Sequence, residues 1–432
     1  MKSYKFLVPL LLVVVFAASL YMLIDTKATI QKQYDGFLAE ARNYREQGVD
    51  VDAEKNYMSA LNVKKSLSLS IEIGEFYRDS GQVKKSISWG ETIITDYPKA
   101  PEAYEFLMDI YRNRQDYVAC FELSEKFEKR KLSSAKVSEI ISDIEYTFFF
   151  NGEYADVGIF SGGLCPVLIE DKWGYVNQQG DKVIANKYTK VGPFSGDLSP
   201  VVDKDKSAYF IDPQGNKKHV VQGVDKITEL GLIENGIFSL YNGSKWAFYD
   251  YDNNYLFGDY DDVSSIGNGV AAVSQNDKWS LIGRDGNKKI DDSFYGVAMD
   301  EKSVVYRNDR VFVLKETTYS MIDLNGKEYG DGYEDVHIFN DNTYAAVRIK
   351  GKWGFVNANG DVVIEAQYDD ARSFSNGLAA VKKDGKWGFI DKENKLVIQP
   401  QFDDSKDFSS SGSVFVLRNG DWELLRLFKY NH

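Results

Sequence analysis

Three arginines recur at one-repeat spacing in the N-terminal third of the chain. Arg45, Arg78 and Arg112 lie 33 and 34 residues apart. A guanidinium group pairs with a carboxylate through two parallel hydrogen bonds, so such a row would suit the acidic side chains of a partner. The competing and favoured interpretation is pairing within the same segment, with the neighbouring acidic residues Glu75, Asp79 and Asp109, or plain solvation.

Patterns typical of catalysis, cofactor binding or metal binding do not occur in the sequence. His219, His337 and His432 are widely spaced and have no companion Ser, Cys or Asp motif. Asp369-Asp370 and Asp403-Asp404 would suit acid–base chemistry, but they recur in successive repeats, which indicates turn and strand-end positions. No Gly-rich phosphate loop and no metal-ligand spacing is present. We therefore expect no enzyme, no cofactor and no metal.

The arginines belong to a segment with helical periodicity. Three units begin at Tyr34, Leu67 and Pro101. When they are aligned, small or slender residues share one position (Ala41, Gly74 and Met108), tyrosines share the next (Tyr44, Tyr77 and Tyr111), and small residues share a third (Ala53, Ser86 and Cys120). These positions resemble the tetratricopeptide repeat, which implies an α-solenoid with a partner-binding groove that the arginines border. The usual tryptophan is missing. Residues 133–149 are expected to form a capping helix.

The N-terminus carries a targeting signal. Lys2 and Lys5 precede residues 6–24, which hold no charge. As a helix this stretch would be roughly 28 Å long, close to the thickness of a bilayer core. The expectation is an uncleaved signal anchor that crosses the membrane once and leaves the bulk of the chain outside the cytoplasm. The alternative is a cleaved signal peptide and a secreted protein.

Charge and cysteine content exclude other classes. The net charge of −13 argues against nucleic-acid binding, which needs a basic surface. The two cysteines, Cys120 and Cys165, lie in different regions of the chain, so neither a disulfide framework nor a zinc site is expected.

The rest of the chain repeats one β-hairpin motif. Residues 378–382 alternate as a strand, Asp384-Gly385 forms a two-residue turn, and residues 386–391 return with Trp387 at their head. Tryptophan marks this position in six of the eight units, at Trp173, Trp246, Trp279, Trp353, Trp387 and Trp422. Ala208 and Tyr319 take its place in the other two. This motif resembles the WG repeat family of bacterial proteins, although the glycine that follows the tryptophan is replaced in the central units and in the last unit.

The points at which the first and last repeats begin and end favour a closed ring over an open β-solenoid. The last hairpin, around Trp422, lacks the trailing aromatic-acidic segment of the other units. Residues 152–163, before the first hairpin, match the stretch 400–412 and would supply it. A propeller needs this kind of exchange between its two ends, and closure removes exposed strand edges. An open array whose boundaries fell at the same places would show the same phase.

Together these patterns predict an α + β repeat protein with three parts. Residues 1–33 would hold the tail, the transmembrane helix and a linker, residues 34–150 the helical domain, and residues 151–432 about eight WG units. Both resemblances imply a membrane-anchored scaffold for protein partners, and the alternative is a cell-envelope glycan-binding protein that uses its aromatic hairpins. The tryptophans are interpreted as core residues. Recognition is expected where the repeat breaks, in the variable turns and the arginine-lined groove.

Overall fold

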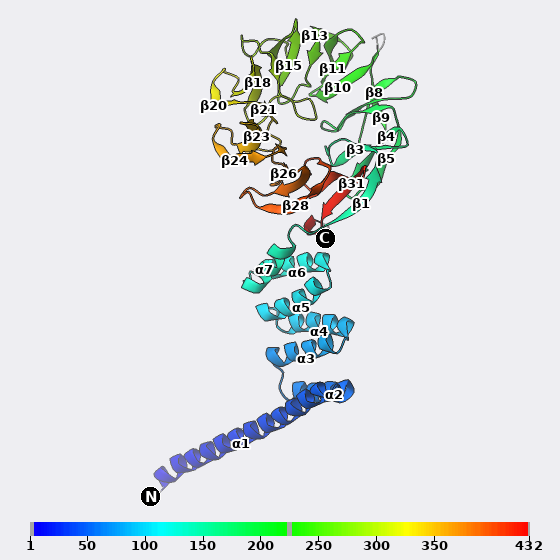
Figure 1. The fold of residues 1–432 in the computed structure, drawn as a ribbon. Coiled ribbons are helices and arrows are strands. Elements are labelled where there is room, and N and C mark those ends of the chain that lie inside the picture. Colours follow the sequence, from blue (N-terminus) through cyan, green and yellow to red (C-terminus); the bar gives the residue numbers. More distant parts are fainter. Residues whose placement is uncertain (1–3, 223–226, 431–432) are drawn as a thin grey trace. The chain divides into compact units, whose positions relative to one another are not determined.

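The computed structural model describes the backbone of residues 4–222 and 227–430, and the side chains of these residues except 4–15 and 17–25. The chain divides into two compact units, with the boundary between Glu145 and Tyr146. The first unit is helical and the second is a ring of small sheets (Figure 1). Each unit is described by itself.

The helical unit consists of antiparallel helix pairs. Among the described residues its helices are α1 (Tyr4–Glu46), α2 (Asp50–Val63), α3 (Leu67–Asp79), α4 (Val83–Asp96), α5 (Pro101–Asn113), α6 (Tyr117–Lys129) and α7 (Ala135–Ile144). The starts of α3 and α5 are the first positions expected for the second and third units. Membership of the tetratricopeptide family stays a prediction.

The expected transmembrane helix over residues 6–24 is wrong. Among the described residues, no helix combines the length and the apolar character that a membrane crossing requires. The chain instead forms one continuous helix, α1, whose side chains from Thr26 onward are exposed or half-buried and include Lys27 and Lys32, apart from the buried Ala41. Within 6–24 only the side chain of Phe16 belongs to the described residues, and the other apolar side chains on which the expectation rested lie outside them.

Small residues allow the helix pairs to pack closely. A Cβ built on Gly74 would lie 2.4 Å from the ring of Phe106 in α5. The hydroxyl of Ser86 donates to the carbonyl oxygen of Gly74 at 2.8 Å, which satisfies a buried polar group. Ala53 and Cys120 are fully buried at equivalent places in their helices. The aligned small positions are therefore contacts between helices.

The expected capping helix is shorter than residues 133–149. α7 begins after Ser134, whose hydroxyl accepts a hydrogen bond from the backbone NH of Val137, and it ends at Ile144. The chain then becomes extended, and Phe148–Tyr154 forms strand β1 of the second unit, where it pairs with β31.

The second unit is an eight-bladed propeller over the described residues. Blade 1 holds β2 (Asp156–Val157), β3 (Leu164–Ile169), β4 (Lys172–Asn177) and β5 (Lys182–Tyr188). Blade 2 holds β6 (Lys190–Val191), β7 (Ser199–Val202), β8 (Ala208–Ile211) and β9 (Lys217–Val220). Blade 3 holds β10 (Glu229–Glu234), β11 (Ile237–Tyr241), β12 (Trp246–Asp250) and β13 (Tyr255–Tyr260). Blade 4 holds β14 (Asp262–Val263), β15 (Val270–Gln275) and β16 (Lys278–Gly283).

The remaining blades follow the same order, with a short inner strand first. Blade 5 holds β17 (Gly296–Val297), β18 (Val311–Lys315), β19 (Thr318–Ile322) and β20 (Glu328–Tyr333). Blade 6 holds β21 (Asp335–Val336), β22 (Ala345–Ile349), β23 (Lys352–Val356) and β24 (Val362–Tyr368). Blade 7 holds β25 (Asp370–Ala371), β26 (Ala379–Lys383), β27 (Lys386–Ile390) and β28 (Leu396–Phe402). Blade 8 holds β29 (Asp404–Ser405), β30 (Ser413–Arg418), β31 (Asp421–Leu427) and β1.

Blade 8 closes the ring with strands from both ends of the unit. β1 pairs antiparallel with β31, from Phe148 opposite Leu427 to Tyr154 opposite Trp422. The hydroxyl of Ser413 also donates to the carbonyl oxygen of Gln178 in blade 1 at 2.9 Å. The preference for a propeller-like ring over an open solenoid is therefore confirmed, and the missing segment of the eighth unit is supplied from the N-terminal side.

The Trp-Gly pair marks a bulge in each regular blade. The register between β27 and β28 shifts directly after Trp387, opposite Gly388. A Cβ built on Gly388 would lie 2.6 Å from the carbonyl oxygen of Ile398 and 2.7 Å from the backbone nitrogen of Pro400. Only glycine leaves room for this backbone approach. The same geometry occurs in blades 1 and 6, at Gly174 and Gly354.

In blade 3, where alanine replaces the motif glycine, the opposite strand supplies a glycine. Ala247 pairs with Gly258, and a Cβ on Gly258 would lie 2.4 Å from the Cβ of Ala247. In blade 8, Glu423 pairs with Glu153 beside a register shift at Gly152. Blade 3 thus keeps the close approach with the glycine on the other strand of the ladder.

Candidate functional site

The three arginines form ion pairs inside the helical unit. Arg45 Nη2 lies 2.5 Å from Asp79 Oδ2, and Arg78 Nε lies 2.9 Å from the other oxygen of Asp79. Arg112 Nη2 contacts Asp143 Oδ2 in α7 at 2.6 Å, a residue that the spacing did not suggest. Glu75 is half-buried and forms no ion pair in the described part of the chain. The guanidinium groups therefore face carboxylates of their own unit.

Replacing Arg45, Arg78 and Arg112 together with alanine is expected to leave the helical unit folded. Each pair is partly exposed, with arginine side chains 28%, 34% and 39% accessible, and such pairs contribute about 0–1 kcal/mol each. Urea unfolding followed by circular dichroism measures the change. A loss well above about 3 kcal/mol would contradict this assignment. Unchanged partner binding by the folded variant would argue against a clamp.

Each tryptophan of the motif packs on the hydrophobic core of its blade. Trp353 and Trp387 are 6% and 5% exposed. The others are half-buried against their blade cores, namely Trp173, Trp246, Trp279 and Trp422. Their indoles are therefore not free rings on the surface of the propeller.

The paired aspartates join neighbouring strands and cap the inner ones. Asp369 Oδ1 lies 2.6 Å from the ammonium of Lys352, and Asp403 pairs with Lys386 at 2.5 Å in the next blade. The second aspartate of each pair accepts the NH of the following residue, as Asp370 does from Ala371 at 2.9 Å. These carboxylates occupy the strand-end positions that their recurrence suggests.

The repeat breaks at the axis of the ring. After the inner strand, blade 5 has a loop of residues 298–310, longer than the corresponding loops 372–378 and 406–412. Two adjoining cavities of about 120 and 280 Å³ share residues of this loop. Residues of blades 1, 5, 6, 7 and 8 line them, and blades 1 and 5 are opposite in an eight-bladed ring. The cavities therefore lie in the central channel.

Three basic residues occupy one register at the channel in consecutive blades. His337, Arg372 and Lys406 each follow directly after the inner strand of blades 6, 7 and 8. Each lies on the motif tryptophan of its own blade. The ring of His337 stacks on Trp353 with centroids 5.1 Å apart, and Arg372 and Lys406 lie 5.7 and 5.5 Å from the centroids of Trp387 and Trp422. We call these three residues the basic arc.

Glu301, from the long loop of blade 5, reaches two residues of the arc. Its Oε1 lies 3.1 Å from Arg372 Nη1 and 3.2 Å from Lys406 Nζ, and Oε2 lies 3.3 Å from Lys406 Nζ. Arg372 and Lys406 are each 19% exposed. One carboxylate thus joins three blades across the channel.

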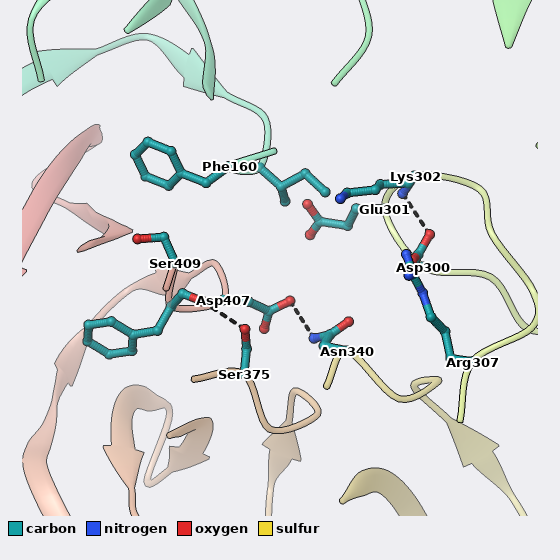
Figure 2. Close-up of a pocket in the computed structure, with 11 residues that line it drawn as sticks. Phe160, Asp300, Glu301, Lys302, Arg307, Asn340, Ser375, Asp407 and Ser409 are labelled. Carbon is teal, nitrogen blue, oxygen red and sulfur yellow. Dashed lines mark hydrogen bonds and ion pairs between the residues drawn. The ribbon is translucent and has the colours of Figure 1, made fainter. Parts of the chain in front are cut away.

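Asp407 is a buried carboxyl group with an incomplete set of hydrogen-bond partners. Burial raises the pKa of this carboxyl to about 6, against the opposing effect of the Arg372 charge. Asn340 donates to its Oδ2 at 2.8 Å, as Figure 2 shows, whereas Oδ1 is buried without a hydrogen-bond partner. Arg372 Nε is likewise buried without a partner. Burial lowers the pKa of His337, and the charge of Arg372 lowers it further.

The long loop holds its own shape through Asp300. Its Oδ1 accepts the backbone NH groups of Lys302 and Val304 at 2.9 Å each, and its Oδ2 lies 2.8 Å from Arg307 Nη2. The Lys302 side chain points into the channel beside Glu301 (Figure 2). Its ammonium has no hydrogen-bond or ion-pair partner among the described residues, and burial together with Arg307 lowers its pKa.

These groups can bind a charged or strongly polar ligand. The channel offers unpaired donors on Arg372 and Lys302 and an unpaired acceptor on Asp407. Within the described residues, no group of His, Cys, Asp and Glu side chains is arranged to hold a metal ion. This site was not predicted from the sequence. The sequence does contain a signal for it, because a basic residue follows Asp-Val, Asp-Ala and Asp-Ser at the same position of three units.

The comparisons with known proteins identify the repeat. Five segments match the family model described as the WG containing repeat, at residues 173–206, 246–279, 332–353, 353–387 and 387–422. None of the curated proteins compared with the chain matches it.

Solved structures resemble the chain only at low identity. They include Kluyveromyces lactis Hsv2p (10% identity, 55% of this chain and 92% of that chain, TM-score 0.38) and a eukaryotic initiation factor (12%, 65% and 85%, TM-score 0.42). The AfRom2 CNH domain is a third (11%, 55% and 94%, TM-score 0.34). The five matched segments show that this chain contains WG repeats.

Proposed function

We propose that the protein is a non-catalytic interaction scaffold whose propeller binds a partner at the central channel. The observation that carries the proposal is the channel itself, where four blades contribute polar side chains, and blade 1 contributes Ile159 and Phe160, to cavities of about 120 and 280 Å³. Binding sites are typically concave and carry a few convergent polar groups, and a propeller offers such a place on its axis. The helical unit provides a second surface for partners.

The channel assignment is tested with a charge reversal that leaves the blades intact. The full-length protein and its Lys302→Glu variant are used to capture partners from native extract, and the partners are identified by mass spectrometry. The captured protein is then purified and its affinity for both forms is measured by calorimetry. Lys392→Glu, in an exposed turn of blade 7, is the matched control. We expect binding to fall at least about tenfold in Lys302→Glu alone. Equal affinity of all three forms would contradict the channel assignment.

A glycan is the second candidate ligand. Tyr255, at the start of the outer strand β13, and Tyr295, directly before the inner strand β17, are each 56% exposed, and exposed aromatic rings stack on sugars. The motif tryptophans pack on blade cores, so these tyrosines would carry such binding. Retention of the protein on purified peptidoglycan, lost in the Tyr255→Ala and Tyr295→Ala double variant, would support this candidate. The absence of retention would remove it.

We also propose that the protein is located outside the cytoplasm. It is supported by the sequence alone, in which Lys2 and Lys5 precede the uncharged residues 6–24. Alkaline phosphatase fused after the last residue becomes active only outside the cytoplasm. An inactive but stable fusion would refute this location.

A further inference from the structure

We propose that the basic arc of His337, Arg372 and Lys406 is a receptor for a carboxylate on an acidic segment of a protein partner, and that Glu301 occupies it from within the chain. This inference rests on the scaffold function proposed above and names the chemistry of its ligand. It makes loop 298–310 a tethered competitor of that partner.

The arc is a prepared site for an anion. Arg372 and Lys406 project from the same position of adjacent blades, and the indoles of Trp387 and Trp422 lie within 6 Å of their charges. A cation held on an aromatic face loses little freedom when it meets an anion, so the site is preorganised. The repeat that builds the core thereby also positions the recognition groups.

Glu301 shows which ligand fits the arc. Its single carboxylate meets both cations at 3.1–3.3 Å, and its side chain is 32% exposed, which is more than either cation. Because the Glu301 carboxylate keeps this access to solvent, its ion pairs are weaker than fully buried ones would be. A second carboxylate can therefore displace it at modest cost.

The loop does not depend on Glu301 for its fold. Asp300 binds two backbone NH groups of the loop and the guanidinium of Arg307, and the carbonyl oxygen of Ser303 accepts the backbone NH of Ser265 at 2.8 Å. In the described part of the chain, the hydrogen bonds and ion pairs of the Glu301 side chain are those with the arc. Its carboxylate is thus free to leave while the loop stays in place.

The space beside the arc admits a side chain. The cavity of about 280 Å³ is lined by His337, Arg372 and Glu301, and it equals roughly nine water volumes at about 30 Å³ each. Arg372, whose Nε is buried without an acceptor, lines this cavity. An incoming carboxylate would supply the acceptor that this donor lacks.

The flanking charges favour a carboxylate over phosphate. Asp404 Oδ1 lies 3.7 Å from Arg372 Nη2, and the charges of Asp407 and Asp370 also act on Arg372. A dianion would meet more repulsion from these groups than a monoanion would. We therefore infer Asp or Glu side chains of a protein segment as the ligand.

The test is a direct binding measurement on the full chain. Fluorescein-labelled hexaglutamate is titrated with the wild-type protein, with Glu301→Gln and with Glu234→Gln, whose carboxylate pairs with Arg284 away from the arc at 2.9 Å. We expect Glu301→Gln to bind about tenfold more tightly than the wild type, which corresponds to an arc that Glu301 fills about 90% of the time. Glu234→Gln should bind like the wild type, and adding Arg372→Gln to Glu301→Gln should abolish the gain.

Other outcomes overturn the inference in distinct ways. If Glu301→Gln is less stable to heat and binds no better, the carboxylate is a structural link. If inorganic phosphate competes as well as acidic peptide at equal concentration, the arc is a general anion site. If a partner is captured in a Lys302-dependent manner while hexaglutamate fails to bind Glu301→Gln, the scaffold function stands and this inference fails.

Discussion

Replacing Gly388 by alanine is expected to lower the free energy of unfolding of the propeller by about 2 kcal/mol. The added methyl would lie 2.6 Å from the carbonyl oxygen of Ile398 and 2.7 Å from the backbone nitrogen of Pro400. Both contacts are to backbone, so no side-chain rotation relieves them, and the bulge of β28 must shift. Urea unfolding followed by tryptophan fluorescence gives the change.

The control is the same substitution at a glycine with open space around it. No atom lies within 4 Å of a Cβ built on Gly36 in α1. Gly36→Ala is expected to be neutral or to stabilise its helix by up to about 1 kcal/mol. If Gly388→Ala were as well tolerated as Gly36→Ala, the steric account of the Trp-Gly motif would be wrong.

The ring was predictable because its signals are local and repeated. Each hairpin carries its turn, its tryptophan and its strand alternation within a few residues, and the exchange between residues 152–163 and 400–412 is visible by alignment. The compensation between Ala247 and Gly258 was not predictable in the same way. It depends on which residues face each other across a bulge, and sequence distance alone does not give that register.

The channel site escaped prediction for a geometric reason. Glu301 meets Arg372 and Lys406 from 71 and 105 residues away, so no short motif joins them. The arc residues are also three different types, which hides their common register. Loop 298–310 is an insertion relative to the other units, and the expectation that recognition lies where the repeat breaks applies to it.

The error at the N-terminus has a different origin. The run 6–24 was judged on its length, its lack of charge and the preceding lysines, whereas the chain continues the same helix to Glu46 with exposed Lys27 and Lys32. Local hydropathy could not reveal that continuity.

Replacing Asp407 by asparagine is expected to raise the free energy of unfolding at pH 7 by about 2 kcal/mol. Burial raises the pKa of Asp407 to about 6 in the folded protein, while an unfolded aspartate titrates near pH ~3.9. Between these values the folded state keeps a proton that the unfolded chain has released. The free energy of unfolding therefore falls as pH rises from about 4 to about 6, and the loss stays complete above that range.

Asparagine removes this loss because it resembles the protonated acid. Its side-chain oxygen can still accept from Asn340, which now donates to Oδ2 of Asp407 at 2.8 Å. The advantage of the variant should be absent below about pH 4 and full above about pH 6, in urea unfolding measured across this range. A smaller advantage at pH 7 than at pH 4 would show that the ionised carboxylate stabilises the channel through Arg372.

Asp403 provides the control, because it is the same residue type a few positions away with the opposite shift. The hydrogen bond and charge of Lys386 lower the pKa of Asp403, so its contribution to stability is present above its unfolded pKa and is lost as pH falls through the folded value. Asp403→Asn should therefore lose stability at pH 7 and approach the wild type in acid. The change in the free energy of unfolding should therefore have opposite signs in Asp403→Asn and Asp407→Asn. That result would distinguish Asp403, which stabilises a strand end, from Asp407, which is buried in the channel without a full set of hydrogen-bond partners. A buried carboxylate that lowers the stability of the fold and lines a cavity is a candidate binding group.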